Sequence, residues 1–506
     1  MIASEAAKRP LRLALLMPAE RAYAWQEHIA AQLAANAELA VDICRVAIAR
    51  RPSAYWHAMT RSIERGHLTA ATVALAADAC WDVVVDLAGI AAAEPWRRRS
   101  RHGVWQPLDA HGVHVAAAFP CHEAICAGKG GELFLVRDGE RVLISMRFSA
   151  SPHYMRALPH IYARSALLIQ AGLSESIHDS HAGMQPAFTP RPLPSRVRRI
   201  LHDLHGHALS CHRRLVRQWL SESWMIGVIE APIQHTLDTR ASPKIKWLGQ
   251  RDSGRYFADP FGVPDQHDRL YCEAYSYSDG RGHIEAITLD GNGEIARAEP
   301  IALSSSGHAS YPYLFKHGGR LYGVPETVEQ RRCELYEVDG DGRWLRVATL
   351  LEDVAAADAT IFFWQGLYWL AYTDLALGAF DNLCLAYAVE LDGPWLRHAR
   401  YPVKLDHRSS RPAGTPFVHE GELYRPAQDC GSTYGEAVVI NRVIVCTPQD
   451  YREEMVRICP PDPQGRNPHG LHTLSAWGER TLVDGKRMVF NRHEWMRKLR
   501  RKLAGA

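Results

Sequence analysis

The sequence predicts a multi-domain protein: an N-terminal α/β domain with a doubly wound sheet, followed by an all-β five-bladed propeller. Two observations support this fold class. A unit made of an apolar strand, a polar turn and a second strand ending near a carboxylate recurs in the second half of the chain. Leu-Tyr pairs open the second strand of four copies at roughly the forty-to-fifty-residue spacing of a four-stranded blade. In the first half, apolar strand-like runs alternate with helical patterns.

The clearest repeat unit is Ala309–Thr327, with a first strand around Leu314 and a second strand that runs into Glu326. The other copies begin at Phe257, Ala357, Arg411 and, in a degenerate form, Leu471. Asp-Gly turns between alternating apolar runs connect further strands between the copies. A β-sandwich is the rival fold, but a sandwich has no reason to repeat Gly-x-Leu-Tyr at blade length.

The first half begins with a continuous apolar strand, Leu11–Met17, followed by strands Ala40–Val46 and Trp81–Gly89. Helical spacing of apolar residues between them indicates a parallel sheet. The predicted parts of the chain are 1–183 for the α/β domain, 184–221 for a Pro-rich linker and basic helix, 222–490 for the propeller, and 491–506 for a basic amphipathic tail.

The composition excludes several classes of function. A net charge of +3 over 506 residues does not indicate a nucleic-acid partner, and no Gly-x-Gly-x-x-Gly or P-loop lysine indicates a nucleotide. The 11 cysteines include no Cys-x-x-Cys, so we expect reduced thiols, no metal and no cofactor. No apolar stretch of about 18 residues is present, and Leu11–Met17 is too short for a signal segment. We therefore expect a cytoplasmic location.

Polar residues recur where the innermost strands of the blades approach the central channel. A carboxylate inside an apolar strand is costly to bury, which makes it a candidate site residue. The candidate catalytic residues are Asp259, Glu326 and Asp358. The candidate substrate-binding residues are Glu273, Tyr311, Arg411, Arg425, Gln428, Asp429, Tyr434 and His472. The alternative is that Asp259 and Asp358 close blade turns through hydrogen bonds to backbone amides.

Paired carboxylates around an aromatic-lined channel suit glycosidic-bond chemistry. One acid protonates the leaving oxygen, and a second carboxylate activates water or attacks the anomeric carbon. We expect Asp259 to be the base or nucleophile and Glu326 the acid, with Asp358 orienting the substrate or tuning the acid.

The motifs RYFADPF, SYPYLF with VPET, DATIFF, SRPAG, RPAQD and LHTLS together resemble the propeller of glucosamine inositolphosphorylceramide transferase-like proteins. That propeller is related to the five-bladed arabinanase and xylosidase families. The resemblance implies work on a polysaccharide or glycolipid in cell-surface glycan assembly. The N-terminal domain resembles formyltransferase-like domains in layout. Its segment 103–129 lacks the Asn-x-His of those enzymes, so we expect formyl transfer to be lost.

The resemblance leaves the activity open. Five-bladed glycosidases generally present Asp, Asp, Glu, whereas this chain offers Asp259, Glu326, Asp358, and the plant transferases use a separate transferase domain. We favour an enzyme, a glycosyl transferase or glycoside hydrolase. The alternatives are a non-catalytic glycan- or lipid-binding scaffold and an acyl or one-carbon transferase. The tail Arg492–Lys502 has the shape of a weak anchor to the inner face of an anionic membrane, or of a solvated basic terminus.

Overall fold

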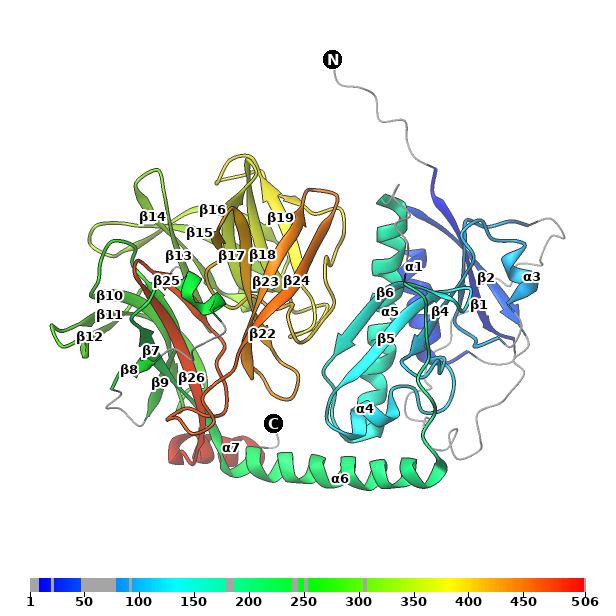
Figure 1. Cartoon of the computed structure of the whole chain (residues 1–506), viewed down its shortest axis with the longest axis horizontal. Helices are drawn as coiled ribbons and strands as arrows, with labels where there is room; N and C mark the ends of the chain where they lie inside the picture. The colour runs from blue at the N-terminus through cyan, green and yellow to red at the C-terminus, as the bar shows by residue number, and fades with distance from the viewer. Residues whose placement is uncertain are drawn as a thin grey trace, which may run out of the picture. The chain divides into compact units, whose positions relative to one another are not determined.

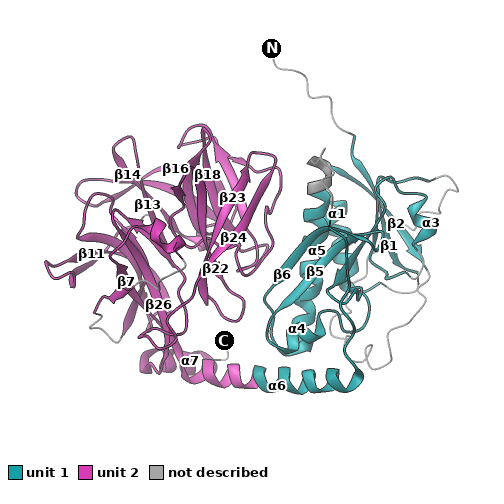
Figure 2. Ribbon diagram, viewed as in Figure 1, with its two compact units in different colours: residues 1–210 teal, residues 211–506 magenta. Residues whose placement is uncertain are grey.

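The computed structural model describes residues 9–19, 22–46, 79–90, 93–178, 186–238, 244–249, 254–303 and 307–504. The chain forms two compact units, Met1–Ser210 and Cys211–Ala506 (Figure 2). This division falls inside the predicted linker segment, while the finer predicted domain bounds stay predictions.

The first unit contains a six-stranded sheet in the order β2-β1-β3-β4-β5-β6 (Figure 1). Its strands are β1 (Leu11–Pro18), β2 (Leu39–Val46), β3 (Val83–Asp86), β4 (Val104–Asp109), β5 (Gly131–Arg137) and β6 (Arg141–Phe148). Its described helices are α1 (Ala24–Ala34), α3 (Glu94–Arg97), α4 (His122–Cys126) and α5 (Tyr154–His178), and α6 (Arg196–Trp219) begins in this unit.

The pairing in this sheet is mixed. Strands β2, β1, β3 and β4 run parallel, and β5 and β6 add an antiparallel hairpin. The central strands are mostly apolar because both of their faces are covered, and Leu15 and Val84 are fully buried. The formyltransferase likeness of this unit is not confirmed and stays a prediction.

The second unit confirms the predicted five-bladed propeller: it contains five four-stranded antiparallel sheets. Blade 1 comprises β9 (Arg255–Gly262), β10 (Arg269–Ser276), β11 (Arg281–Leu289) and β12 (Ile295–Pro300). Blade 2 comprises β13 (Ser310–His317), β14 (Arg320–Glu326), β15 (Arg332–Val338) and β16 (Trp344–Glu352). Blade 3 comprises β17 (Ala356–Trp364), β18 (Leu367–Asp374), β19 (Cys384–Ala388) and β20 (Leu396–Arg397). Blade 4 comprises β21 (Phe417–His419), β22 (Glu422–Asp429), β23 (Ala437–Cys446) and β24 (Tyr451–Cys459).

Blade 5 is assembled from both ends of the unit. Its strands are β25 (Leu474–Trp477), β26 (Arg480–Val489), β7 (Ser221–Ile229) and β8 (Ile245–Trp247). The red strand β26 pairs with the green strand β7 along nine residue pairs, from Thr481 with Ile229 to Val489 with Ser221 (Figure 1). Short 3-10 turns η1 (Ile233–Leu237) and η2 (Val328–Gln330) and helix α7 (Arg492–Leu503) complete the unit.

Three inner strands carry the same backbone irregularity. The register of β9, β13 and β17 against the second strand of each blade shifts around Asp259, Tyr311 and Asp358, respectively. These three residues have φ values of 50°, 45° and 51°, which non-glycine residues seldom adopt. A bulge changes the direction of a side chain relative to the strand. The repeated bulge therefore places equivalent side chains of three blades in one region.

Helix α7 packs on the end of α6 within the second unit. The rings of Trp219 and Trp495 stack with centroids 6.2 Å apart, and Lys498 Nζ donates a hydrogen bond to the carbonyl oxygen of Arg217 at 2.9 Å. Among the described residues, no helix is both long and apolar enough to span a bilayer.

We expect Trp477→Ala to destabilise the propeller by about 3–5 kcal/mol, the usual cost of truncating a buried tryptophan. Trp477 is 1% exposed, and its Nε1 donates to the carbonyl oxygen of Gln266 in blade 1 at 2.6 Å, so it joins blade 5 to blade 1. Chemical denaturation of the full chain measures the loss. Val418→Ala, at a half-exposed position, is the control and should change stability by less than about 0.5 kcal/mol. Equal effects of the two substitutions would contradict the role of Trp477.

Candidate active site in the propeller channel

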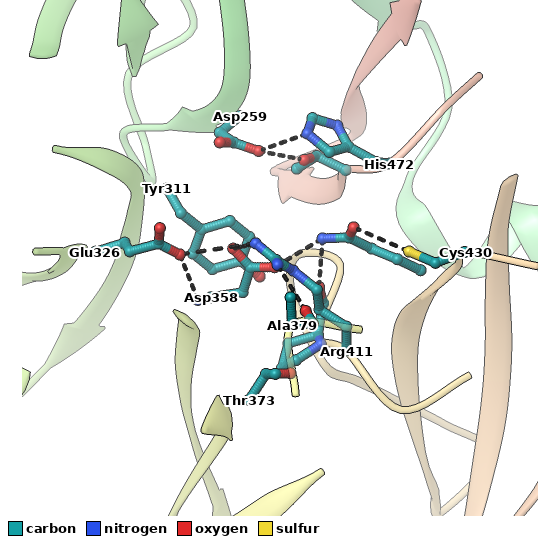
Figure 3. A network of polar contacts seen from close by, with 12 residues as sticks. Asp259, Tyr311, Glu326, Asp358, Thr373, Ala379, Arg411, Cys430 and His472 are labelled. Atoms are coloured by element: carbon teal, nitrogen blue, oxygen red, sulfur yellow. Dashed lines mark hydrogen bonds and ion pairs between the residues drawn. The ribbon is translucent and has the colours of Figure 1, made fainter. Parts of the chain in front are cut away.

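The second strand of each blade contributes one side chain beside the start of the inner strand. Glu273 is paired with Ala258, Glu326 with Ser310, and Thr373 with Ala357. In blade 4 the amide of Gln428 donates to the carbonyl oxygen of Arg411, and in blade 5 Asp484 accepts the amide of His472. Glu326 and Thr373 appear with the bulge residues Asp259, Tyr311 and Asp358 in the polar network of the channel (Figure 3).

Side chains of blade 4 bind both carboxylate oxygens of Asp358. Asp358 accepts hydrogen bonds from Arg411 Nε at 2.5 Å and from Gln428 Nε2 at 2.7 Å. Arg411 Nη2 lies 3.3 Å from the other carboxylate oxygen, so the pair is bidentate. The same guanidinium lies 3.9 Å from Glu326 Oε2 and donates to the carbonyl oxygen of Ala379. Arg411 thus links the carboxyls of blades 2 and 3 to blade 4.

Asp259 lies in a second half of the network. Its Oδ1 accepts a hydrogen bond from Thr473 Oγ1 at 2.9 Å and lies 3.5 Å from His472 Nε2. His472 Nδ1 lies 2.7 Å from Asp484 Oδ2, close enough for an ion pair although the angle is poor for a hydrogen bond. The imidazole stacks on Trp224, with centroids 3.9 Å apart. The side chains of Asp259, Thr473, His472, Asp484 and Trp224 are all buried.

Two carboxylates cap backbone amides of neighbouring blades. The amide of Asp259 donates to Asp484 Oδ2, and the amide of Asp358 donates to Glu326 Oε2, both at 2.9 Å. The hydrogen bonds accepted by the carboxylates of Asp259 and Asp358 come instead from side chains of other blades. The two aspartates at the bulges are therefore held as side-chain acceptors, contrary to the alternative in which they close their own turns.

Burial dominates the protonation of the channel acids. It raises the pKa of Asp259 to about 6, although His472 opposes the shift, and it raises the pKa of Asp358 to about 6, although Arg411 opposes it. The pKa of Glu273 rises well above its usual range through burial and the charges of Asp259 and Glu326. Carboxyls with such raised pKa values can be found both protonated and ionised near neutral pH, as acid–base catalysis requires.

Burial alone would lower the pKa of His472, but the carboxylates of Asp484 and Asp259 outweigh it and raise that pKa. The donor atoms of Asp259, His472 and Asp484 all lie within 4.8 Å of one another. Among the described residues of the channel, these three could together bind a metal ion. In this structure their side chains contact one another instead.

The structure brings most of the predicted site residues together. Two groups of contacts hold them (Figure 3). Glu326 and Asp358 contact each other and Arg411, and Gln428 donates to Asp358. Asp259 contacts His472 in the other group, and the charge of Asp358 acts on Asp259. Tyr311 accepts the amide of Gly414 at 2.6 Å. Tyr434 lies against His472 and under the Arg411 guanidinium, 5.2 Å from its ring centroid. Glu273 lies close enough to these acids for their charges to raise its pKa.

Two predicted binding residues point elsewhere. Arg425 is 1% exposed and forms a bidentate pair with Glu453 of the outer strand β24 at 2.6 and 2.9 Å. Asp429 pairs with the half-exposed Arg408. Alternate residues of a strand face opposite sides, so Gln428 faces the channel while Arg425 and Asp429 face away from it. The prediction that they line the channel is therefore corrected.

Some channel residues were not predicted. Asp484 and Thr473 belong to the degenerate fifth copy, and Trp224 lies in β7, before the first repeat. Lys486 lies 5.2 Å from the ring centroid of Trp224, and burial lowers its pKa. The available signal was the position of Asp484, which directly follows the apolar residues Leu482 and Val483 in the second strand of the fifth copy, where the other copies run into a carboxylate.

A separate cavity of about 680 Å³ lies between the outer parts of blades 4 and 5. Trp247, Leu471 and Arg457 line it together with Asn467, whose buried amide has no hydrogen-bond partner. It contains none of the predicted site residues.

The family model described as glucosamine inositolphosphorylceramide transferase 1, N-terminal, matches residues 247–470. Over these residues the propeller is similar to the N-terminal part of glucosamine inositolphosphorylceramide transferase 1. The protein of that name from Arabidopsis thaliana is 30% identical over 256 residues, covering 46% of this chain and 33% of the relative. The one from Oryza sativa subsp. indica is 30% identical over 210 residues, covering 40% of this chain and 28% of the relative. The chain thus spans about a third of the length of these relatives.

Solved structures similar to the transferase-like propeller include a family 117 glycoside hydrolase from Zobellia galactanivorans. It is 12% identical, with a TM-score of 0.34, covering 48% of this chain and 89% of that one. An exo-β-1,3-galactanase from Clostridium thermocellum is 12% identical, with a TM-score of 0.31, covering 42% of this chain and 53% of that one.

We expect Asp259→Asn to stabilise the transferase-like propeller above pH 6. Because the folded-state pKa of Asp259 is raised from 3.8 to about 6, folding favours its protonated form, and that stability is lost as the pH rises between these values. The variant should gain up to about 3 kcal/mol at pH 8, and the difference should vanish below pH 4. Urea denaturation between pH 4 and 8 measures it. A loss above about 2 kcal/mol at pH 8 would show that the carboxylate supports the bulge.

Arg411→Met should destabilise the propeller by about 3–5 kcal/mol, because it leaves the buried Asp358 without its cation. Adding Asp358→Asn should recover part of the loss. Arg442→Met, which breaks the surface pair with Glu454, is the matched control and should leave the stability nearly unchanged, because solvent screens that pair. Additive losses in the double variant would contradict a coupled pair.

Proposed function

We propose that this chain is a carbohydrate-active protein that transfers or hydrolyses a glycosyl unit in the propeller channel. The observation that carries the proposal is the gathering of three buried carboxyls. The amide of Asp358 donates to Glu326, the charge of Asp358 acts on Asp259, and the pKa values of Asp259 and Asp358 both lie near 6. Neighbouring carboxyls that share protons near neutral pH can supply both an acid and a base.

In this proposal Asp259 is the base or nucleophile, oriented by Thr473. Asp358, held by Arg411 and Gln428, orients the substrate. Glu326 is the acid, acting through the oxygen that does not cap the amide of Asp358. Glu273 is the competing acid, since burial and neighbouring charges keep its proton in place.

The substrate class follows from the relatives' printed name and from the charge of the channel. Because Glu273 keeps its proton, the negative charges of the channel come from Asp259, Glu326, Asp358 and Asp484. They outnumber the cationic side chains beside them, which are Arg411, His472 and Lys486, and Lys486 is also paired with Glu222. An ammonium group is attracted to such a site, so we propose an amino sugar, exchanged with a polysaccharide or an inositol phosphate-containing glycolipid in cell-surface glycan assembly.

A second candidate function is a glycan- or lipid-binding module without catalysis. It is favoured by the fact that the matching family model is the N-terminal part of the relatives, and by the closed pairing of Arg411 with Asp358.

The N-terminal unit, with its parallel strands, is proposed to be formyltransferase-like in fold without formyl transfer. We also propose a cytoplasmic location with peripheral membrane contact through the exposed Arg500, Arg501 and Lys502 of α7.

The experiment incubates the full chain with free and lipid-linked amino-sugar oligosaccharides and detects products by mass spectrometry across pH. The turnover rate should follow a bell-shaped pH profile. Asp259→Asn should lower the rate at least about 100-fold. Of Glu326→Gln and Glu273→Gln, the one that removes the acid should lower it by the same factor. Asp279→Asn, in an exposed turn of blade 1, is the control. Binding without turnover would favour the module, and turnover that survives all three substitutions would remove the channel acids from the mechanism.

A further inference from the structure

A second cluster of reactive side chains lies in the first unit, where α4 meets the beginning of α6. His122 and Cys126 are four residues apart in α4, so they share one face of that helix. Asp203 of α6 completes the cluster, and it lies 81 residues after His122 in the sequence. His122 is 3% exposed and Cys126 is 1% exposed.

The close approach of the two helices depends on Gly206, the buried residue of α6. A Cβ atom at this position would lie 2.4 Å from the carbonyl oxygen of Pro152 and 3.0 Å from Cys126 Cα. The first distance is too short for any side chain and the second is tighter than usual, so glycine at this position lets α6 pass this near Pro152 and α4. Asp203, one turn earlier in α6, is thereby brought against His122.

The three donor atoms form a triangle suited to one metal ion. His122 Nε2 lies 2.8 Å from Asp203 Oδ1, and Cys126 Sγ lies 3.8 Å from the nitrogen and 3.9 Å from the oxygen. Around a tetrahedral zinc ion, sulfur lies about 3.5 Å from the other two donors, which lie about 3.3 Å from each other. Metal binding therefore needs the distance between His122 Nε2 and Asp203 Oδ1 to grow by about half an ångström. The two distances from Cys126 Sγ need to shorten slightly.

We propose that His122, Cys126 and Asp203 bind a divalent transition metal ion of the zinc type. An imidazole, a thiolate and a carboxylate are the donor set that zinc accepts, and the thiolate disfavours magnesium and calcium. The ion takes the place of the proton between His122 and Asp203. This proposal is independent of the channel and its chemistry.

The cluster leaves one coordination position for a small molecule. The Asp203 side chain is half exposed, and it lines a cavity of about 320 Å³ together with Tyr154, His153 and His207. His202, whose Nδ1 is buried without a hydrogen-bond partner, has its ring centroid 6.5 Å from that of His122. Three protein ligands beside an accessible cavity are typical of a zinc site with an exchangeable fourth ligand, here water.

The competing explanation is that the hydrogen bond from His122 to Asp203 merely fastens α6 to α4. The two explanations differ in the role of Cys126, whose thiol contributes little to such a fastening. Spectroscopy of the thiolate therefore separates them.

The test titrates the untagged full chain with Co²⁺ and follows the absorption spectrum. We expect one equivalent to bind with a thiolate-to-cobalt charge-transfer band, and Zn²⁺ to displace it. Cys126→Ser should abolish the band, and His122→Gln and Asp203→Asn should each weaken binding at least tenfold. Cys211→Ser and His205→Gln, at exposed positions of α6, are matched controls that should change neither.

Circular dichroism checks that each variant is folded. If Cys126→Ser does not fold, Asp203→Asn decides the question, because its half-exposed side chain is replaced by one of the same shape. The proposal is overturned if no Co²⁺ binds, if Co²⁺ binds without the charge-transfer band, if the band survives in Cys126→Ser, or if Asp203→Asn leaves the affinity unchanged.

Discussion

The buried ion pair between Arg411 and Asp358 is the interaction on which the channel depends. Both side chains are at least nine-tenths buried, so neither charge could stay ionised without the other at a tolerable cost. The guanidinium also contacts the carbonyl oxygen of Ala379 and lies near Glu326, so one side chain links groups of blades 2 and 3 to its own blade 4. A propeller could close around an apolar channel. This one holds a buried charge pair at its centre instead, and the pair sets the positions of the neighbouring acids.

The bulges on the inner strands make that pairing possible. At Asp259 and Asp358 the left-handed backbone turns the carboxylate away from its own blade. The backbone amide of each aspartate instead donates to a carboxylate of a neighbouring blade. Each bulge is thus stabilised by the blade beside it. Blade 5 closes the ring with β7 and β26, which brings Trp224 against His472 and completes the half of the network around Asp259.

The sequence was sufficient for the propeller because its repeat positions carry strong local signals. Asp259, Tyr311 and Asp358 occupy equivalent places in three copies, and equivalent places converge in a ring, so their meeting could be predicted. The face of a strand was harder to predict. Arg425 and Asp429 flank Gln428 in one motif, but their side chains lie on the other face and pair with Glu453 and Arg408.

The remaining site residues depend on contacts between distant segments. Trp224 precedes every repeat and reaches the channel only because blade 5 takes strands from both ends of the unit. His122 and Asp203 likewise show no ligand spacing in the sequence, since they lie on different helices and meet only where Gly206 lets those helices touch. Periodicity reports which residues are equivalent within a repeat. It does not report which helix or strand will close against another.

The distribution of hydrogen bonds separates structural acids from chemical ones in the channel. Asp484 accepts backbone amides of Asp259, His472 and Thr473, so its lone pairs serve the fold. Glu326 uses one oxygen in the same way, and its other oxygen is the one that the proposed role as acid would use. Asp259 accepts one side-chain hydroxyl, from Thr473, beside the His472 imidazole. Because a base needs lone pairs that the fold does not use, Asp259 is better suited than Asp358 or Asp484 to take a proton from a substrate.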